Sequence, residues 1–408
     1  MREKLKFNVI IPTRERGDTL YHCLHTVVAQ DYENLNIIVS DNFSQDGTFE
    51  VVKSFKDARI QYVNTGSRMS MSHNWEFALN HVTDGWVMFI GDDDGICPGA
   101  IELLNHLVQE HQVEAVSSAH GVFIWPDHFV NDKNGVLSLP LTNSVSVKNS
   151  RLEFGKVFAG KMGYQNLPYL YHGGAASLDL INRLRDKSGR FFCSQIPDLY
   201  SAVAFSVATE KFLSIGIPLV IAGSSKHSTG ASNYSDSPNS GSNPIAQFKA
   251  EKNIPFHESL ILGKSLQVML YESYLQSSHV HRGEVVVSLE TQLRAAIRAA
   301  PAVHGEEILA ECRTIAIKNG FLFSYTYGKV ERLLGSVARI FVTSRVAFFR
   351  LQLDAKELGL QNIYDATVAS ACLYRFMRNR PWLLFLLGVK NLANSTILKL
   401  SRFFRHPR

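Results

Sequence analysis

The sequence predicts an α/β fold, in which a mostly parallel central sheet with helices on both faces is followed by an α-helical C-terminal part. Three observations support this prediction. Short apolar runs rich in β-branched residues alternate with segments of helical spacing between residues 7 and 90. These runs are continuously apolar, which is typical of parallel strands that are buried on both faces. Beyond residue 245, Gly and Pro become rare, and Leu, Ala and Val recur at helical spacing.

The first elements are predicted in the order strand, helix, strand. Residues 7–11 (FNVII) and 36–40 (NIIVS) are the strands, and residues 19–29 between them have helical spacing after Asp18, a candidate helix cap. The elements that follow are a helix at 51–55, a strand at 60–63, a helix at 75–82 and a buried strand at 86–90 (WVMFI).

The later elements are less regular, and they suggest a division of the chain. Residues 115–147 are predicted as irregular strands and loops, and residues 223–244, rich in Ser, Gly, Asn and Pro, as a loop or linker. The remaining predicted elements are a helix at 199–212, a strand at 217–222 and helices at 260–275, 285–299 and 305–318. We therefore predict an N-terminal unit (residues 1–235), a linker (236–250) and a helical C-terminal region (251–408).

Composition and charge describe a globular body with a basic tail. The 408 residues are 45% hydrophobic and 19% charged, which excludes a disordered or fibrous chain. Residues 339–408 carry a net charge of +9 and the preceding residues one of −4. Within the tail, residues 339–353 and 382–404 combine aromatic and aliphatic residues with Arg and Lys, as interfacial helices on anionic membranes do. A pair of core helices with exposed basic ends is the alternative.

The sequence predicts a cytoplasmic protein, with the inner face of the cell membrane as a second location reached through the tail. The five cysteines are far apart, and residues 1–6 leave no room for a signal peptide before the first strand. The longest uncharged run of the tail, residues 381–389, has nine residues, too few to cross a bilayer. There is no nucleic-acid-binding motif, so nucleic acid is not a predicted partner, whereas the helical region could mediate an oligomer.

Three polar clusters follow predicted strands, at the points where those strands end. They are Pro12-Thr13-Arg14-Glu15-Arg16, Asp41-Asn42 and Asp92-Asp93-Asp94. Ligands of parallel α/β sheets bind at the carboxyl ends of the strands. We therefore expect the three clusters to meet in one site.

The acidic triple Asp92-Asp93-Asp94 is the most informative of these clusters. Adjacent carboxylates repel one another unless a cation neutralises them, and a hard divalent ion is the usual solution. The alternative is a solvated acidic turn closed by Gly95, and the position directly after an apolar strand disfavours it. If the strand continued, Asp92 and Asp94 would point to one side and Asp93 to the other.

Asp41 is a second candidate ligand-binding residue. It ends the second strand and could accept hydrogen bonds from a base or a ribose at the switch point of the sheet. Capping a turn together with Asn42 is an equally ordinary role for this residue. Asp46-Gly47 is predicted as a plain turn and helix start.

These residues resemble a known family. The stretch VIIPTRERGDTLYHCLHTVVAQDYENLNIIVSDNFSQDGT, followed by GWVMFIGDDDG, resembles the nucleotide-sugar-binding half of family-2 type glycosyltransferases with the GT-A fold. The resemblance covers roughly residues 7–230. Two departures concern the donor site: Arg14-Glu15 replaces the commoner Tyr-Asn, and Gly91 stands where many members have the first Asp of their motif.

The resemblance implies roles for individual residues. Asp198, in Ile196–Tyr200, matches the segment that carries the general base; a helix cap is its alternative and is compatible with catalysis. His227 is a candidate metal or phosphate ligand, although a lone His is more often structural, and Arg68 is either a phosphate ligand or a solvated loop arginine. The implied donor-binding residues are Pro12, Thr13, Arg14, Glu15, Asp41, Arg68, Asp92 and Asp93, and the implied ligands of Mn²⁺ or Mg²⁺ are Asp94, Asp92 and His227.

The predicted function is therefore that of a metal-dependent, inverting glycosyltransferase. It would move a sugar from a nucleotide-diphosphate sugar, with UDP as the expected nucleotide, to a saccharide or lipid-linked acceptor in surface polysaccharide or glycolipid synthesis. The alternative is a nucleotide-sugar-binding or scaffolding protein of the same fold without catalysis. A nucleotidyltransferase is disfavoured because Pro12–Asp18 contains a single Gly rather than a glycine-rich loop.

Overall fold

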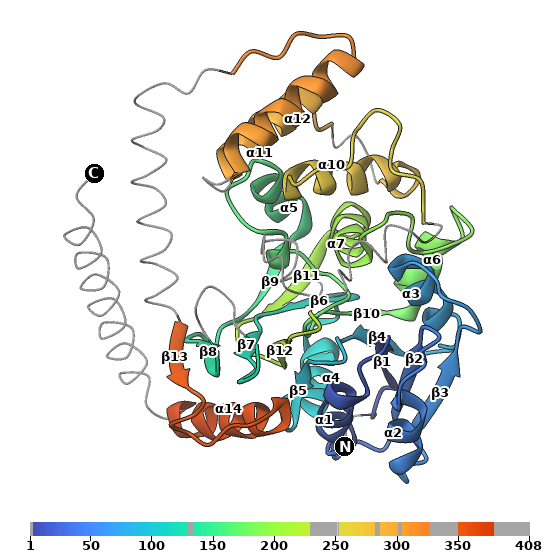
Figure 1. Ribbon diagram of the computed structural model, residues 1–408, viewed down its shortest axis with the longest axis vertical. Helices are drawn as coiled ribbons and strands as arrows, with labels where there is room; N and C mark the ends of the chain where they lie inside the picture. Colours follow the sequence, from blue (N-terminus) through green and yellow to red (C-terminus); the bar gives the residue numbers. More distant parts are fainter. Residues whose placement is uncertain are drawn as a thin grey trace, which may run out of the picture.

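The described residues of the computed structural model form two β-sheets with helices around them and a helical C-terminal part (Figure 1). The structure describes residues 3–128, 134–228, 251, 253–281, 286–300, 304–325 and 350–378. The predicted linker at 236–250, the tail helix at 382–404 and most of the segment 339–353 lie outside these residues.

The larger sheet begins with strands that run parallel to one another. Its strand order is β3-β2-β1-β4-β10-β6-β11-β9, so β1 has β2 on one side and β4 on the other. The parallel strands are β1 (Phe7–Thr13), β2 (Leu35–Asp41), β3 (Ile60–Asn64) and β4 (Trp86–Phe89), and the helices between them are α1 (Gly17–Val28), α2 (Thr48–Ser54) and α3 (Met71–Leu79). The predicted α/β class is confirmed, whereas α2 and α3 each begin a few residues earlier than predicted.

The second half of the larger sheet mixes strand directions. β10 (Ala175–Ser177) runs antiparallel to β4 and to β6 (Ala115–Ser118), β11 (Lys211–Ile215) is parallel to β6, and β9 (Val145–Asn149) closes the edge. The helices here are α4 (Ala100–His111), α5 (Ser150–Phe158), α6 (Leu178–Arg185) and α7 (Pro197–Ala208), with a 3₁₀ turn, η1, at Tyr164–Asn166. The predicted helix at 199–212 is wrong at its end, because residues 211–212 already belong to β11.

The smaller sheet joins distant parts of the chain. Its order is β13-β8-β7-β12-β5, with β5 (Gly95–Ile96), β7 (Gly121–Ile124), β8 (Val136–Pro140), β12 (Val220–Ser224) and β13 (Arg350–Asp354). The helix predicted for 339–353 is wrong over residues 350–353, which form β13. Leu351 and Leu353 alternate with polar neighbours and lie opposite Leu139 and Leu137 of β8, which is the periodicity of a strand.

The C-terminal part is helical, as predicted. Its helices are α10 (Leu266–Gln276), α11 (Leu289–Ala299), α12 (Gly305–Lys318) and α14 (Ile363–Arg378), with a 3₁₀ turn, η2, at Ser278–Val280. α10 packs against α5 and α7, whereas α14 packs against α1 and β12, at the opposite end of the molecule (Figure 1). The division of the chain at residues 235 and 251 stays a prediction.

The hydrophobic core lies on both faces of the larger sheet. Alternation along β1 sends Ile10 to one face, which α3, α7 and α10 cover, and Val9 and Ile11 to the other, which α1, α4 and α14 cover. Because both faces are covered there, β1, β2 and β4 are mostly apolar, and polar side chains gather where these strands end. The fold therefore places its polar chemistry at the carboxyl edge of the sheet.

Candidate functional site

The candidate site lies where the strand order reverses, between β1 and β4. Thr13 ends β1, and its hydroxyl donates a hydrogen bond to Oδ2 of Asp92, which follows β4, over 2.8 Å. Asp41 ends β2 directly opposite Thr13 in the strand register. The three predicted clusters therefore meet at one edge of the sheet, which is the usual ligand position in such folds.

The acidic triple is buried in a tight turn between the two sheets. Asp92, Asp93 and Asp94 are 1%, 5% and 0% exposed, so the alternative of a solvated acidic turn is wrong. They form a turn between β4 and β5 rather than a continuation of the strand. Strand alternation consequently does not apply, and the three carboxylates contact different partners.

Asp94 ties the turn to the second sheet. Its carboxylate accepts hydrogen bonds from the backbone N–H groups of Gly91 (2.7 Å) and Gly223 (2.8 Å), so both oxygens are engaged. Nε2 of His172 lies 3.5 Å from Oδ2 of Asp94. Burial and the neighbouring charge of Asp93 hold the pKa of Asp94 well above its usual value.

Asp92 is paired with Arg16. Nη1 of Arg16 lies 3.0 Å from Oδ1 of Asp92, and its Nη2 donates to the backbone carbonyl of His227. Burial raises the pKa of Asp92, and the charge of Arg16 opposes that shift. Burial lowers the pKa of Arg16, but the charges of Asp92 and Asp93 outweigh this effect and raise it. This ion pair partly neutralises the buried turn.

Asp93 leaves one oxygen available. Oδ2 accepts hydrogen bonds from the hydroxyls of Ser225 (2.7 Å) and Ser228 (2.5 Å), while Oδ1 accepts none from any described residue. In the part of the chain that the structure describes, no group of three His, Cys, Asp or Glu is arranged to hold a metal. The triple nevertheless fits a hard divalent cation by charge and by oxygen chemistry, because three buried carboxylates face one guanidinium.

His227 contacts α1 rather than the acidic turn. Its Nε2 lies 3.2 Å from Oδ2 of Asp18, and Nζ of Lys226 lies 3.4 Å from the same oxygen. Burial tends to raise the pKa of Asp18, but the hydrogen bond from His227 and the charges of both partners lower it. Asp18 is therefore not the cap of α1, which begins at Gly17, and instead it holds the loop after β12 against that helix.

The predicted donor-binding residues after β1 are engaged in ion pairs. Nη1 of Arg14 lies 2.6 Å from Oε1 of Glu251, and Arg68 pairs with Glu15. Glu15 has a positive φ of 54°, which is uncommon for a residue other than Gly. Pro12 lies opposite Ser40 of β2. The structure thus brings these residues to the edge of the site, and their binding of a donor stays a prediction.

Asp41 has partners on both carboxylate oxygens. Oδ1 accepts a hydrogen bond from the backbone N–H of Ser44 (2.9 Å), and Oδ2 accepts bonds from Oη of Tyr62 (2.5 Å) and Nδ2 of Asn64 (3.1 Å). Burial and the bond to Asp41 raise the pKa of Tyr62 to about 12. The turn-capping role of Asp41 is therefore present, and Asp46 likewise accepts from Thr48 at the predicted start of α2.

Asp198 faces the same region from α7. It lies in the first turn, after Pro197, and the helix cap is Ile196, so Asp198 is not a cap. Oη of Tyr164 donates to Oδ2 of Asp198 over 2.7 Å, and burial raises the pKa of this carboxyl. Burial raises the pKa of Tyr171, and the charges of the acidic triple and of Asp198 add to this effect. Oη of Tyr171 lies beside Gly91, at the start of the acidic turn.

The N-terminal part of the chain is similar to a known protein family. The segment from β1 to just before β10 matches the family model described as "Glycosyl transferase family 2", over residues 8–170. This segment is similar to glycosyl transferase family 2, which confirms the predicted family resemblance for residues 8–170. The mostly parallel sheet with helices on both faces confirms the predicted α/β class. Asp198 and His227 lie beyond the matched glycosyltransferase segment.

Curated relatives resemble the same family 2 segment. The chain is 33% identical over 108 residues to a GalNAc(5)-diNAcBac-PP-undecaprenol beta-1,3-glucosyltransferase of Campylobacter jejuni, covering 26% of this chain and 35% of that protein. It is 23% identical over 166 residues to the UDP-Glc:alpha-D-GlcNAc-diphosphoundecaprenol beta-1,3-glucosyltransferase WfaP of Escherichia coli, covering 40% and 64%. The chain thus spans about a third of the first relative and less than two thirds of the second.

Two solved structures match the chain at low similarity. S. aureus TarS 1-349 has a TM-score of 0.41 at 15% identity, covering 81% of this chain and 89% of that one. The mannosyltransferase PcManGT from Pyrobaculum calidifontis, in complex with GDP-Man and Mn²⁺, has a TM-score of 0.41 at 14% identity, covering 92% and 88%. TM-scores of this size support no inference about the ligands of this chain.

Several residues of this candidate site were not singled out from the sequence. Arg16 stood in the first polar cluster without a role of its own, and Ser225, Tyr171 and His172 were not identified. His172 has a positive φ of 46°, and its ring is tilted by 40° against that of Tyr171, with 3.8 Å between the centroids. No sequence signal marks such a conformation, although the following Gly173-Gly174 indicates an irregular backbone.

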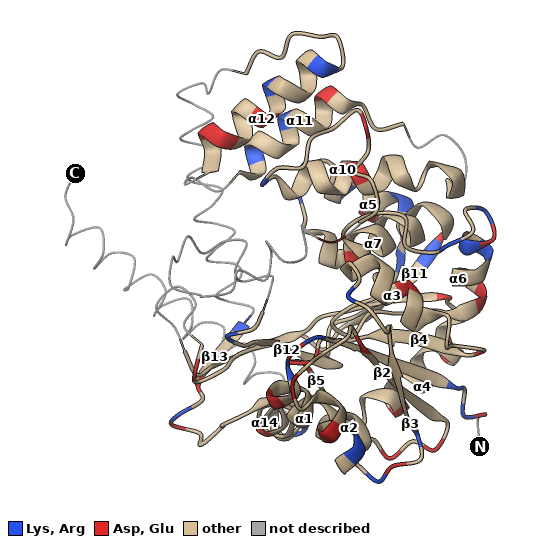
Figure 2. Cartoon of the chain, turned by 45° about the vertical axis from the view of Figure 1, so that its right-hand side comes forward, with Lys and Arg blue, Asp and Glu red and all other residues tan. Residues whose placement is uncertain are grey.

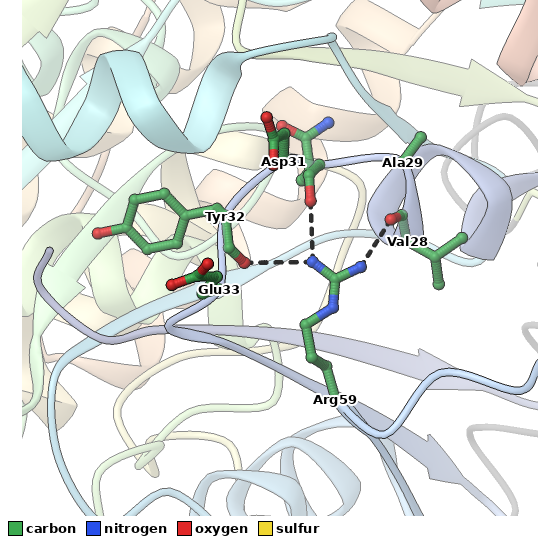
Figure 3. Close-up of a pocket in the computed structure, with 7 residues that line it drawn as sticks. Val28, Ala29, Asp31, Tyr32, Glu33 and Arg59 are labelled. Carbon is green, nitrogen blue, oxygen red and sulfur yellow. Dashed lines mark hydrogen bonds between the residues drawn. The ribbon is translucent and has the colours of Figure 1, made fainter.

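A surface pocket elsewhere in the family 2 segment has a structural explanation. It lies between the end of α1 and the start of β2, at the edge of the sheet opposite the candidate site (Figure 3). The guanidinium of Arg59 points at backbone carbonyls there and donates to those of Val28, Gln30 and Tyr32. These hydrogen bonds satisfy backbone carbonyls at and after the end of α1, so Arg59 stabilises the fold at this position.

A helix that spans a membrane must be long and continuously apolar. Among the helices that the structure describes, none is both long and apolar enough to cross a bilayer.

Proposed function

We propose that the chain is a glycosyltransferase that moves a sugar from a nucleotide-diphosphate sugar to a hydroxyl of a saccharide or lipid-linked acceptor. One observation carries this proposal: the buried acidic triple lies at the carboxyl edge of the sheet, where Thr13 and Arg16 contact Asp92. The triple is suited to a donor, and Asp198 on α7 is the carboxylate that we assign to the acceptor. The family 2 match of residues 8–170 supports the donor half.

Asp198 would act as the general base. Its raised pKa brings the carboxylate closer to the proton affinity that a base needs, and Tyr164 fixes the orientation of one oxygen. The acceptor hydroxyl would give its proton to Asp198 as its oxygen attacks the anomeric carbon. A single base and a direct displacement produce inversion at that carbon.

The leaving nucleotide diphosphate would lie at the acidic turn, beside Arg16. When bound, Mn²⁺ or Mg²⁺ would stabilise the negative charge of the leaving group. Oδ1 of Asp93 is the triple's oxygen that accepts no hydrogen bond from a described residue, and we propose it as the first ligand. Asp92, Asp94 and His227 stay candidates, although the oxygens of both carboxylates already accept hydrogen bonds.

The names of the relatives suggest the donor and the acceptor. One name specifies UDP-Glc, and both specify acceptors linked to undecaprenol through a diphosphate. We therefore propose UDP as the nucleotide, a diphosphate-linked lipid as the acceptor carrier, and the inner face of the membrane as the location of the protein. The basic tail predicted for this contact lies largely outside the described residues.

Calorimetric titration of the full chain with UDP, GDP and dTDP, each with and without Mn²⁺, tests the donor half of this proposal. We expect UDP to bind and Mn²⁺ to tighten that binding, because Arg16 neutralises the three buried carboxylates only in part. Binding of GDP or dTDP alone would overturn the choice of UDP. If none of the three bound, the glycosyltransferase proposal would fail and the non-catalytic scaffold would replace it.

Tyr164→Phe is expected to shift the pH profile of transfer. The hydrogen bond from Tyr164 stabilises the ionised form of Asp198, so its removal raises the pKa of that carboxyl further. Asp198 then stays protonated up to a higher pH. In a plot of kcat against pH, the acid limb should therefore shift toward higher pH by about one unit. An acid limb that stays in place, measured by product formation from low to neutral pH, would remove Tyr164 from this role.

A further inference from the structure

A second charged cluster lies against α3 and consists of Arg185, Arg190, His73 and Glu76. Nη1 of Arg190 lies 3.4 Å from Nε2 of His73, and Nη2 of Arg185 lies 3.4 Å from Oε1 of Glu76. His73 and Glu76 are about one turn apart on α3, so the two guanidinium groups contact neighbouring positions of one helix face. Basic residues gather on α6 and the loop after it in Figure 2.

This cluster lies near the acceptor side of the candidate site. His73 is in the first turn of α3, which begins at the carboxyl edge of the sheet after β3. Arg190 belongs to the segment that leads from α6 to Asp198, and this segment is fixed to α3 by the hydroxyl of Ser72, which donates to the carbonyl of Ser194 over 2.6 Å. The segment therefore carries Arg190 of the cluster and leads directly to the proposed base in α7.

The described residues neutralise and satisfy the two arginines only in part. The carboxylate of Glu76 already accepts hydrogen bonds from the backbone N–H groups of Phe191 (3.0 Å) and Phe192 (2.9 Å). Arg185 is within ion-pair distance of Glu76 but lacks hydrogen-bond geometry, and Arg190 forms no ion pair with a described residue. In both arginines, Nε and Nη2 are buried without a hydrogen-bond partner in the described part of the chain.

We propose that Arg185 and Arg190 bind a phosphoryl group of the acceptor, namely the diphosphate that joins its saccharide to a lipid. Two adjacent guanidinium groups present planar pairs of donors, which match phosphate oxygens in bidentate fashion. An anion here would also accept hydrogen bonds from donors that otherwise stay unsatisfied at a free-energy cost. The proposal rests on the proposed function, and it separates an acceptor phosphate site from the donor site at the acidic turn.

Binding to the full chain tests this inference with farnesyl diphosphate, inorganic pyrophosphate and UDP as ligands. Arg190→Gln and Arg185→Gln should each weaken farnesyl diphosphate binding by about tenfold or more, because each removes a charged hydrogen-bond donor. Arg183→Gln is the matched control. Arg183 is on the same helix but is exposed and paired with Glu114, so its loss should change affinity by less than about twofold. UDP affinity should be unchanged in all three variants.

Other outcomes of these binding measurements would contradict the phosphate site, its lipid-linked ligand or the proposed function. Equal farnesyl diphosphate affinity in Arg190→Gln and the unaltered chain, or an equal loss in Arg183→Gln, would overturn the site. Binding of pyrophosphate but not farnesyl diphosphate would overturn the lipid-linked source. A parallel loss of UDP affinity would assign the arginines to the donor. Absence of UDP binding to the unaltered chain would instead refute the proposed function. If the glutamine variants do not fold, Arg190→Lys replaces them. Lys keeps the positive charge but lacks the planar pair of donors, so this variant should still bind farnesyl diphosphate more weakly.

Discussion

Asp198→Asn is expected to abolish sugar transfer while leaving nucleotide binding unchanged. The amide cannot take the proton of the acceptor hydroxyl, and general-base catalysis of this kind contributes about 10³-fold to the rate. The donor site lies at the acidic turn, which Asp198 does not contact through a hydrogen bond. Transfer measured with a nucleotide-sugar donor should fall by that factor, and calorimetric UDP affinity should stay the same.

We expect the Asn variant to stay folded, because the substitution removes a charge that its partly buried surroundings disfavour. The pKa of Asp198 is raised in the folded protein, so the folded state favours the neutral carboxyl. Its stabilising contribution is lost as the pH rises through the folded pKa, and ionised Asp198 costs stability at neutral pH. Asn keeps an acceptor for Tyr164, so the thermal midpoint at pH 7 should not decrease.

The matched control is Asp186→Asn, at the other end of the segment that leads to Asp198. Asp186 is exposed, follows α6 and should have no effect on transfer. Turnover of Asp198→Asn close to that of the unaltered chain would remove Asp198 from the role of base. A joint loss of transfer and UDP affinity would instead show that Asp198 shapes the donor site.

The regular part of the fold was predictable because its periodicity is local. Residues 7–11, 36–40 and 86–90 are continuously apolar, and such runs identify parallel strands without any knowledge of their neighbours. The carboxyl-end rule then brings Thr13, Asp41 and Asp92 together, although they are distant in sequence. The edge of the sheet that carries the site thus follows from strand order and hydrophobicity alone.

Long-range pairing explains what sequence reasoning missed. β13 pairs with β8, which lies some two hundred residues earlier in the chain, and nothing near residue 350 specifies that partner. The directions of the three carboxylates depend on Gly223, Arg16 and Ser225, each contributed by another element. Strand alternation gave the wrong orientation because the chain turns at Asp92 to enter the second sheet. Side-chain partners of this kind are fixed by tertiary structure, not by spacing.

Gly223→Ala is expected to destabilise the protein by about 3 kcal/mol and to abolish UDP binding. An added Cβ would lie 1.8 Å from the backbone carbonyl oxygen of Asp93, a distance that no relaxation of side chains can relieve. β12 and the acidic turn must therefore separate. That separation breaks the bond from the N–H of Gly223 to Asp94 and displaces Asp93 from Ser225. Urea denaturation followed by tryptophan fluorescence measures the first effect, and calorimetry with UDP and Mn²⁺ the second.

Gly155→Ala is the matched control, with an expected effect of opposite sign. Gly155 lies within α5, and its added Cβ would meet no atom within 4 Å. Because Ala loses less backbone entropy than Gly in a helix, this variant should be more stable by about 0.5–1 kcal/mol and should bind UDP normally. If Gly223→Ala kept both its stability and its UDP affinity, the close contact between β12 and the acidic turn would not exist in the protein. The acidic triple would then be held open by elements other than the second sheet.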